Sequence, residues 1–330
     1  MPDSLPPSPV TPVTQPVSTQ PLSGARDWQP VMQRVQERFA EVESPTNIVR
    51  LFHGRGKTYP GFHEVTVDLL GSVILVGLYG EKDAAAYEFA RTLGNRLAGS
   101  VEAVLVQHRQ GRQTQAEVVW GALPETVVGQ EAGISYLLQP TRNQNVGLFL
   151  DAAPLRSWVR ANAQGANVLN LFAYTCGFSL AAVAGGARQV VNNDMSRAAL
   201  DWGQANHELN DDDPRSVRYV PHNLFKSWWK LKQFARYDLI IFDPPTNQRG
   251  SFNAEKDYAT MLKRLPDLAA PRAKIVACLN SPFLDYQFLE NQIARWAPKA
   301  RIKERLAASV DFPEAEPERA LKVVLCDWVS

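Results

Sequence analysis

Short apolar runs in the second half of the chain set its main pattern. Residues 168–172 and 237–242 alternate too little for half-exposed strands and are typical of strands buried on both faces of a parallel sheet. Residues 178–184 have the pattern of a crossover helix that leads to a second strand, residues 189–193. This order predicts a βαβ unit in an α/β sheet.

The apolar pattern downstream extends that sheet. The predicted elements are a helix over 257–269, a strand over 274–278, a helix over 283–296 and two last strands near Ala307 and Val323. Together these elements predict a mostly parallel sheet over residues 143–330.

The first half of the chain has a different pattern. Short β-like runs at residues 65–70 and 73–78 precede a helix near 84–97, and further strands are expected near 101–107 and 116–120. We therefore expect a small α+β domain over residues 47–142. Before it, residues 25–46 carry a helix, and residues 1–24 form a Pro-rich tail that is expected to be disordered.

The turn after the strand at 168–172 is a candidate cofactor site. Gly177 can adopt a positive φ angle there and let a ligand approach the backbone. Asp194 follows about 20 residues later, where a carboxylate can hold ribose hydroxyls. A dinucleotide site needs the spacing G-x-G-x-x-G, but this turn has one glycine. The pattern favours S-adenosylmethionine over a nicotinamide dinucleotide, and the alternative is a βαβ unit without a ligand.

A second motif, Asp243-Pro244-Pro245-Thr246, ends the strand at 237–242. Two consecutive prolines cannot continue a β ladder, so they make the chain rigid just outside the sheet. They fix the Asp243 carboxylate as an acceptor facing an incoming nucleophile. A chance turn could give the same tetrapeptide, but its order and spacing after the first motif favour a methyltransferase.

Four segments carry a resemblance to a known family: GLFLD at 147–151, NLFAYT at 170–175, DMSR at 194–197 and DPPT at 243–246. They resemble the bacterial 23S rRNA large-subunit methyltransferase family, its guanine-N7 branch more closely than its cytosine-C5 branch. The resemblance implies a class I, Rossmann-like methyltransferase fold with a mostly parallel, seven-stranded sheet over residues 143–330. It also implies S-adenosylmethionine as the methyl donor and 23S rRNA, or a precursor ribosomal particle, as the partner.

The resemblance assigns roles to residues of this chain. The expected donor-binding residues are Asn170, Phe172, Ala173, Tyr174, Thr175, Gly177, Asp194, Met195, Ser196, Asn223 and Asp243. The expected catalytic residues are Asp243, Pro244, Pro245, Thr246 and Asn280, and Arg156 and Asn247 are expected to contact the substrate. No metal is expected.

The chain departs from the family at several positions. Cys176 stands where a glycine is usual, and its side chain is expected to narrow the cofactor turn. Ala153 replaces a polar residue before Arg156, and Asn247 replaces an aromatic residue. Two alternatives therefore stay open, namely a protein or small-molecule acceptor, and a non-catalytic paralogue that binds RNA or cofactor.

Charge does not decide between these functions. The net charge of +1 gives no global basic surface for RNA, so RNA contacts would need local patches. Candidate patches are residues 53–57, His108 with Arg109 and Arg112, and the lysines and tryptophans of 226–232, although the last set has the spacing of a helix with a core face. The acidic segment 311–318 would repel phosphate if it lay free beside the cleft.

Three cysteines form neither an even disulfide framework nor a metal-ligand motif, which favours a reducing cytoplasm. Cys278 has two possible roles. Cytosine-C5 methylation requires a thiolate nucleophile, whereas an unpaired cysteine on an apolar strand is more often a buried core residue. Methylation of guanine N7 needs neither a covalent step nor proton removal.

Overall fold

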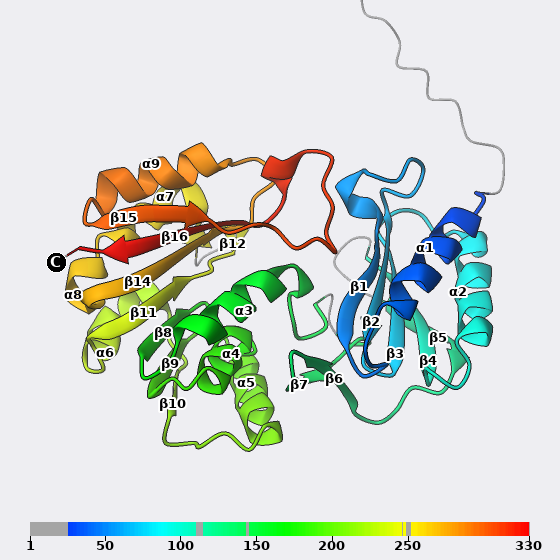
Figure 1. The fold of residues 1–330 in the computed structure, drawn as a ribbon, viewed down its shortest axis with the longest axis horizontal. Coiled ribbons are helices and arrows are strands. Elements are labelled where there is room, and N and C mark those ends of the chain that lie inside the picture. The colour runs from blue at the N-terminus through cyan, green and yellow to red at the C-terminus, as the bar shows by residue number, and fades with distance from the viewer. Residues whose placement is uncertain (1–25, 110–114, 143–144, 246, 249–251, 330) are drawn as a thin grey trace, which may run out of the picture.

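The structure is a computed structural model that describes residues 26–109, 115–142, 145–245, 247–248 and 252–329. The predicted tail, Arg112 and Thr246 lie outside these ranges. The described chain forms a five-stranded sheet and a seven-stranded sheet that lie next to each other (Figure 1). No helix in these ranges is long and apolar enough to cross a lipid bilayer.

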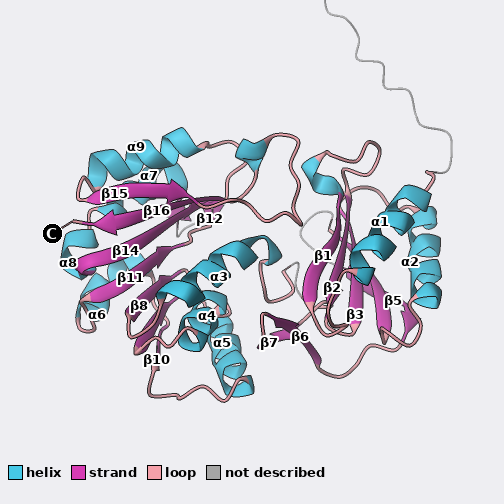
Figure 2. Ribbon diagram, viewed as in Figure 1, coloured by secondary structure: helices cyan, strands magenta, loops and turns pink. Residues whose placement is uncertain are grey.

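The N-terminal sheet has the order β1-β2-β3-β4-β5, in which β3 and β4 are parallel and the other neighbours antiparallel. Its strands are β1 (Ile48–His53), β2 (Val65–Leu70), β3 (Val73–Leu78), β4 (Ala103–His108) and β5 (Gln115–Gly121). Two helices, α1 (Gln29–Ala40) and α2 (Ala84–Arg96), cover one face of this sheet (Figure 2). Asp83 caps α2 by accepting a hydrogen bond from the Ala85 amide, and the apolar stripe of α2 packs on the sheet.

The C-terminal sheet has the order β10-β9-β8-β11-β14-β16-β15, and β16 is antiparallel to both of its neighbours. In that order the strands are Val217–Val220, Gln189–Asn193, Asn167–Leu171, Tyr237–Phe242, Ala269–Leu279, Lys322–Trp328 and Ala300–Arg305. This arrangement confirms the predicted α/β fold with a mostly parallel seven-stranded sheet. The prediction placed β15 too late, near Ala307. Only Ala300 of this edge strand is buried, so its sequence has no apolar signal.

Helices cover both faces of the seven-stranded sheet (Figure 1). One face carries α3 (Ala153–Asn162), α4 (Gly177–Ala184) and α5 (Arg197–Leu209), and the other carries α6 (Trp228–Lys232), α7 (Ala254–Leu262), α8 (Leu265–Leu268) and α9 (Tyr286–Trp296). The helix predicted over 257–269 is therefore two helices. Its last residue, Ala269, already belongs to β14.

The two sheets share a hydrophobic core. Between them lies the hairpin of β6 (Val127–Glu131) and β7 (Ile134–Leu138), and β12 (Asn247–Gln248) and β13 (Phe252–Asn253) form a second, minimal ladder. One cluster of buried side chains runs from Leu75 through Tyr136 to Ile241. It crosses the boundary predicted at residues 142 and 143, so the hairpin joins the two sheets.

The acidic segment 311–318 folds back onto the N-terminal sheet. Asp311 forms an ion pair with Arg38 (2.7 Å), and Glu316 forms one with Lys57 (3.3 Å). The Ala315 amide donates to the Gly56 carbonyl at 2.8 Å, and a side chain at Gly56 would collide with Pro313. Asp311 and Glu316 are therefore paired with cations of α1 and of the predicted basic patch 53–57, so these two carboxylates do not lie free as the sequence argument against phosphate required.

Candidate active site

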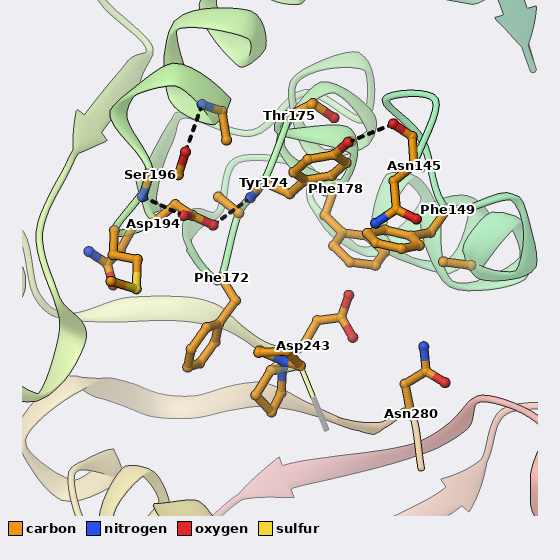
Figure 3. Close-up of a pocket in the computed structure, with 18 of the residues that line it drawn as sticks. Asn145, Phe149, Phe172, Tyr174, Thr175, Phe178, Asp194, Ser196, Asp243 and Asn280 are labelled. Carbon is orange, nitrogen blue, oxygen red and sulfur yellow. Dashed lines mark hydrogen bonds between the residues drawn. The ribbon is translucent and has the colours of Figure 1, made fainter. Parts of the chain in front are cut away.

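A cavity of about 380 Å³ opens at the carboxyl ends of β8, β9, β11 and β14 (Figure 3). Crossovers from β8 and β11 leave toward opposite sides of the sheet, and such a switch point forms the ligand crevice of open α/β sheets. The sequence-predicted residues that line it are Arg156, Phe172, Ala173, Tyr174, Thr175, Gly177, Asp194, Met195, Ser196, Asn223, Asp243, Pro244, Pro245 and Asn280. Folding brings these separate segments to one cavity.

Two predicted residues have other surroundings. Asn170 lies inside the sheet below the cavity, fully buried, where its amide donates to the Asn192 side chain at 2.9 Å. Asn247 begins β12, where its backbone pairs with that of Asn253. Asn170 therefore stabilises the strands that carry the site and does not line the cavity.

The turn between β8 and α4 is held in an unusual backbone conformation. Phe172, Tyr174 and Cys176 have φ angles of 59°, 48° and 66°, a left-handed region that costs a non-glycine residue about 1–2 kcal/mol. Gly177 was expected to supply the positive φ, but it is the first residue of α4, and Cys176 takes the left-handed position before it. Several hydrogen bonds to the turn offset this strain.

Asp194 provides one of those hydrogen bonds and also accepts one from the turn after β9. One carboxylate oxygen accepts from the Tyr174 amide at 2.9 Å, and the other accepts from the Ser196 amide at 2.8 Å (Figure 3). Each oxygen keeps a lone pair, so the carboxylate can still accept ribose hydroxyls from the cavity. Asp194 thus links the turns after β8 and β9 while facing the cavity.

Cys176 does not narrow the cavity, contrary to the sequence expectation. Its side chain is fully buried and packs with Ala173 and Leu200 on the far side of the turn. It fits there because α5 has a glycine opposite it: a Cβ atom at Gly203 would lie 2.4 Å from the Cys176 sulfur. The departure from the family is therefore compensated within the fold.

Apolar side chains that the sequence analysis did not identify complete the walls of the cavity. Phe149, Phe178, Leu224 and Phe225 line it, and Phe225 stacks on Phe252 with ring centroids 6.3 Å apart. Asn223 caps the short helix beside them, because its side-chain oxygen accepts from the Phe225 amide at 3.0 Å. An apolar slot next to a carboxylate suits the flat base and the ribose of adenosine. Only Phe149 had a sequence signal, since it lies in the GLFLD segment.

The carboxyl groups of Asp243 and Asp151 lie on the other side of the cavity. Burial, and then the nearby charge of Asp151, raise the pKa of Asp243 to about 7. Burial also raises the pKa of Asp151, although the Arg156 and Arg50 guanidinium groups act in the opposite direction. The Asp243 carboxyl and the Asn280 amide point into the cavity (Figure 3). Asp243 therefore titrates near neutral pH in a place that an acceptor would reach.

Cys278 lies behind Asp243 and not in the cavity. It is fully buried on β14, and its thiol hydrogen-bonds the Asp243 carboxyl. Burial raises the pKa of this thiol well above its ordinary value, and the Asp243 charge adds to the rise. A thiolate is strongly disfavoured there, so Cys278 has the core role and not the role of a nucleophile.

The Arg156 guanidinium group forms hydrogen bonds within the protein. Its guanidinium group forms two hydrogen bonds of 2.6 Å with the Glu131 carboxylate and donates to the Phe149 carbonyl at 2.8 Å. The side chain is 3% exposed. Arg156 therefore fastens the β6–β7 hairpin to the wall of the cavity. These hydrogen bonds use three of its five N–H groups, and its contact with the substrate stays a prediction.

The patch of lysines and tryptophans at 226–232 is mainly a core face. Trp228 and Leu231 are buried in the core on the α6 side of the sheet. Trp229 is 58% exposed, with the Lys230 ammonium group 5.5 Å from its ring centroid. The helical spacing noted in the sequence thus gives a buried face, with one exposed ring beside it.

A second cavity of about 330 Å³ adjoins the first and lies between the two sheets. Both cavities are lined by Asn145, Leu148, Phe149, Asp151, Asn280 and Leu321. The second is also lined by Arg50, Arg55 and Arg109 of the N-terminal sheet and by Arg319, which follows the acidic segment. Within the described residues, no group of His, Cys, Asp and Glu side chains could hold a metal ion.

Comparison with known proteins identifies the chemistry of this site. Residues 49–327 match a family described as S-adenosylmethionine-dependent methyltransferase. The chain belongs to this family. S-adenosylmethionine is therefore the cofactor, and the Asp194 carboxylate beside an apolar slot fits its adenosine part.

The methyltransferase is similar to solved structures of the same fold. A Streptococcus mutans protein named as a SAM-dependent methyltransferase has a TM-score of 0.79 at 23% identity, covering 94% of this chain and 84% of that one.

A second solved structure, of a protein named as a methyltransferase and complexed with S-adenosylhomocysteine (SAH), has a TM-score of 0.78 at 24% identity. It covers 90% of this chain and 79% of that one. Ribosomal RNA large subunit methyltransferase I of Aeromonas salmonicida is 29% identical over 64% of this chain and 55% of its own length. Ribosomal RNA large subunit methyltransferase K/L of a Psychrobacter strain is 37% identical over 42% of this chain and 18% of its own length. The methyltransferase thus spans about half, or less, of the curated relatives it matches.

Proposed function

We propose that this methyltransferase modifies a base of large-subunit ribosomal RNA, with guanine N7 preferred to cytosine C5. The observation that carries the proposal is the position of Asp243, Pro244 and Asn280. All three line the donor cavity, and Asn280 also lines the adjoining second cavity, whose walls carry arginines. The names of the related ribosomal RNA methyltransferases support the same acceptor class.

In this proposal the bound S-adenosylmethionine supplies an electrophilic methyl group. Asp194 holds the ribose hydroxyls, Asn223 and the apolar slot hold the adenine, and Tyr174 and Thr175 shape the turn below. Asp243 and Asn280 orient the acceptor base, and the N-terminal sheet forms the outer wall of its cleft. Positioning and electrostatics would carry the rate, because the N7 lone pair needs no base to activate it.

Guanine N7 is preferred because the C5 route has no suitable nucleophile among the residues around the cavity that the structure describes. Cys278 is buried behind Asp243 and is held as a thiol. Methylation at N7 also gives the base a positive charge, which the neighbouring Asp243 and Asp151 carboxylates would stabilise when ionised.

The test is transfer of a radiolabelled methyl group to 23S rRNA transcribed in vitro, which has no prior modification. We expect one labelled nucleotide, identified as N7-methylguanine by its sensitivity to mild chemical cleavage, and loss of labelling in Asp243→Asn. The matched control Asp201→Asn changes an exposed aspartate of α5. Labelling of a protein or a small molecule in place of the RNA would overturn the acceptor, and binding of both ligands without transfer would identify a non-catalytic paralogue.

A further inference from the structure

The walls of the second cavity carry more arginine charge than the carboxylates around them neutralise. Arg50 is neutralised, because its Nη2 lies 3.2 Å from an Asp68 carboxylate oxygen and its Nε also donates to that group. Arg55, Arg109 and Arg319 form no ion pair with any residue that the structure describes. The carboxylates left on the walls are Asp151 and Glu314.

The other titratable groups do not remove this excess. Burial, together with the Arg50 and Arg55 charges, lowers the pKa of His53 to about 3, so this wall residue is neutral. Burial raises the pKa of Glu314, and burial also raises that of Asp151, which makes both carboxyl groups poorer anions. Three guanidinium groups therefore face at most two partly disfavoured carboxylates.

Aromatic rings hold the arginines in place. The Arg55 guanidinium lies over the Tyr79 ring, 4.1 Å from its centroid, and the Arg109 guanidinium is 5.2 Å from the same centroid. Arg109 also donates to the Tyr79 hydroxyl. The Arg109 Nε also donates to the Gln107 side chain at 2.5 Å. Stacking of this kind orients a planar guanidinium, and its remaining N–H groups can bind an anion. Arg55 and Arg109 are therefore preorganised around one ring on the cavity wall.

We infer that this second cavity binds the phosphodiester group beside the acceptor base, with Arg55, Arg109 and Arg319 as its donors. This inference rests on the proposed function. Guanidinium groups match phosphate oxygens in geometry and charge, and a polynucleotide brings such a group within one nucleotide of the base. The cavity shares Asp151 and Asn280 with the donor cavity, so a base could extend from the phosphate towards Asp243. Because a stacked base could not reach that point, the nucleotide must be unpaired or extruded.

The experiment compares the full-length wild-type protein with the double variant Arg55→Gln/Arg319→Gln. The control is Arg91→Gln, which removes one positive charge from an exposed position on α2, and the single variant Arg55→Gln, which also removes one, is measured beside it. The probe is a fluorescent single-stranded RNA, and its affinity is measured by anisotropy over a range of salt concentrations. Calorimetric binding of SAH reports separately on the donor cavity.

We expect the double variant to bind RNA at least about tenfold more weakly than Arg91→Gln, since hydrogen bonds to charged groups contribute strongly to affinity. The slope of log affinity against log salt should become less negative by about 0.7 for each lost phosphate contact. SAH affinity should stay unchanged. If the double variant loses SAH binding through misfolding, the RNA affinity of the single variant Arg55→Gln is compared with that of Arg91→Gln instead, because Arg55 is exposed and its substitution should not disturb the fold.

RNA affinity and salt slope equal to those of Arg91→Gln would overturn the phosphate site, even if the wild-type protein methylates RNA. A wild-type protein that binds SAH but neither binds nor methylates RNA would overturn the proposed function, and the phosphate site with it. The two failures are therefore distinguishable.

Discussion

At the residue scale, we expect donor binding to depend most on Asp194. Its carboxylate fixes the Tyr174 and Ser196 amides and still faces the cavity. We predict that Asp194→Ala weakens SAH binding by about tenfold to a hundredfold, because hydrogen bonds to a charged group contribute about 1.5–3 kcal/mol. Calorimetric titration measures the loss, with Asp201→Asn as the control. SAH affinity equal to the wild type would show that Asp194 does not hold the ribose.

Asp243 should make donor binding depend on pH, since its pKa is raised to about 7. S-adenosylmethionine carries a sulfonium charge that an ionised Asp243 would attract, whereas SAH is neutral. Below about pH 7 Asp243 is protonated, and it must lose this proton when the sulfonium cation binds. The affinity for S-adenosylmethionine should therefore fall by up to about tenfold for each pH unit below that value, while the SAH affinity stays constant. Titration of both ligands at about pH 6 and about pH 8 measures this difference.

Asp243→Asn is the control for that prediction. In this variant the affinity for S-adenosylmethionine should no longer depend on pH. If the ratio of the two ligand affinities of the wild-type protein does not change with pH, the proposed role of Asp243 is contradicted.

The raised pKa of Asp243 should also affect the stability of the fold. Between the ordinary value of 3.8 and about 7 the folded state holds this proton more tightly than the unfolded chain. The carboxyl therefore lowers stability as pH rises through that window, and the asparagine variant should lack this loss.

At the level of elements, the β8–α4 turn and α5 depend on one close contact. The sulfur of Cys176 occupies the space that a side chain at Gly203 would need. We predict that Gly203→Ala destabilises the protein by about 1–3 kcal/mol, the usual cost of overpacking. This should occur although alanine is the better helix former. Chemical denaturation measures the change.

The double variant Cys176→Gly/Gly203→Ala tests the cause of that loss. A Cβ atom at Gly203 would lie 2.4 Å from the Cys176 sulfur and 2.9 Å from the Cys176 Cβ atom, and glycine at 176 removes both. Gly203→Ala should therefore cost less stability in the Cys176→Gly protein than in the wild type. Equal costs in the two backgrounds would mean that the glycine at 203 serves another purpose.

Across the whole molecule, the two sheets should unfold together. One buried cluster runs through both sheets and the β6–β7 hairpin, and the Arg38–Asp311 and Lys57–Glu316 ion pairs join them a second time. We predict one cooperative thermal transition. SAH at about 100 times its dissociation constant should stabilise the entire transition by about 2.7 kcal/mol, although it binds beside one sheet only. Calorimetry that resolves two transitions, with only one shifted by SAH, would contradict this coupling.

The sequence by itself determined the elements whose signals are local. The strands at 189–193 and 237–242, the crossover helix and the turn that presents Asp194 follow from residues close to one another in the chain, because backbone preferences and apolar periodicity act over a few residues. The prolines after Asp243 likewise fix their own surroundings. These local patterns predicted the α/β fold class and favoured S-adenosylmethionine as the cofactor, whereas the resemblance to a known family supplied most of the residues predicted around the first cavity.

Only the tertiary structure decided which charges are paired and which side chains are packed, because these depend on residues that are distant in the chain. Arg156 looks like a free cation in the sequence, but Glu131 neutralises it. Cys176 looks like an obstacle, but Gly203 makes room for it. The acidic segment pairs with residues more than two hundred positions earlier, and the second cavity combines arginines from β1 to the end of that segment. Burial, charge neutralisation and close approach of side chains depend on positions in space, which no local pattern specifies.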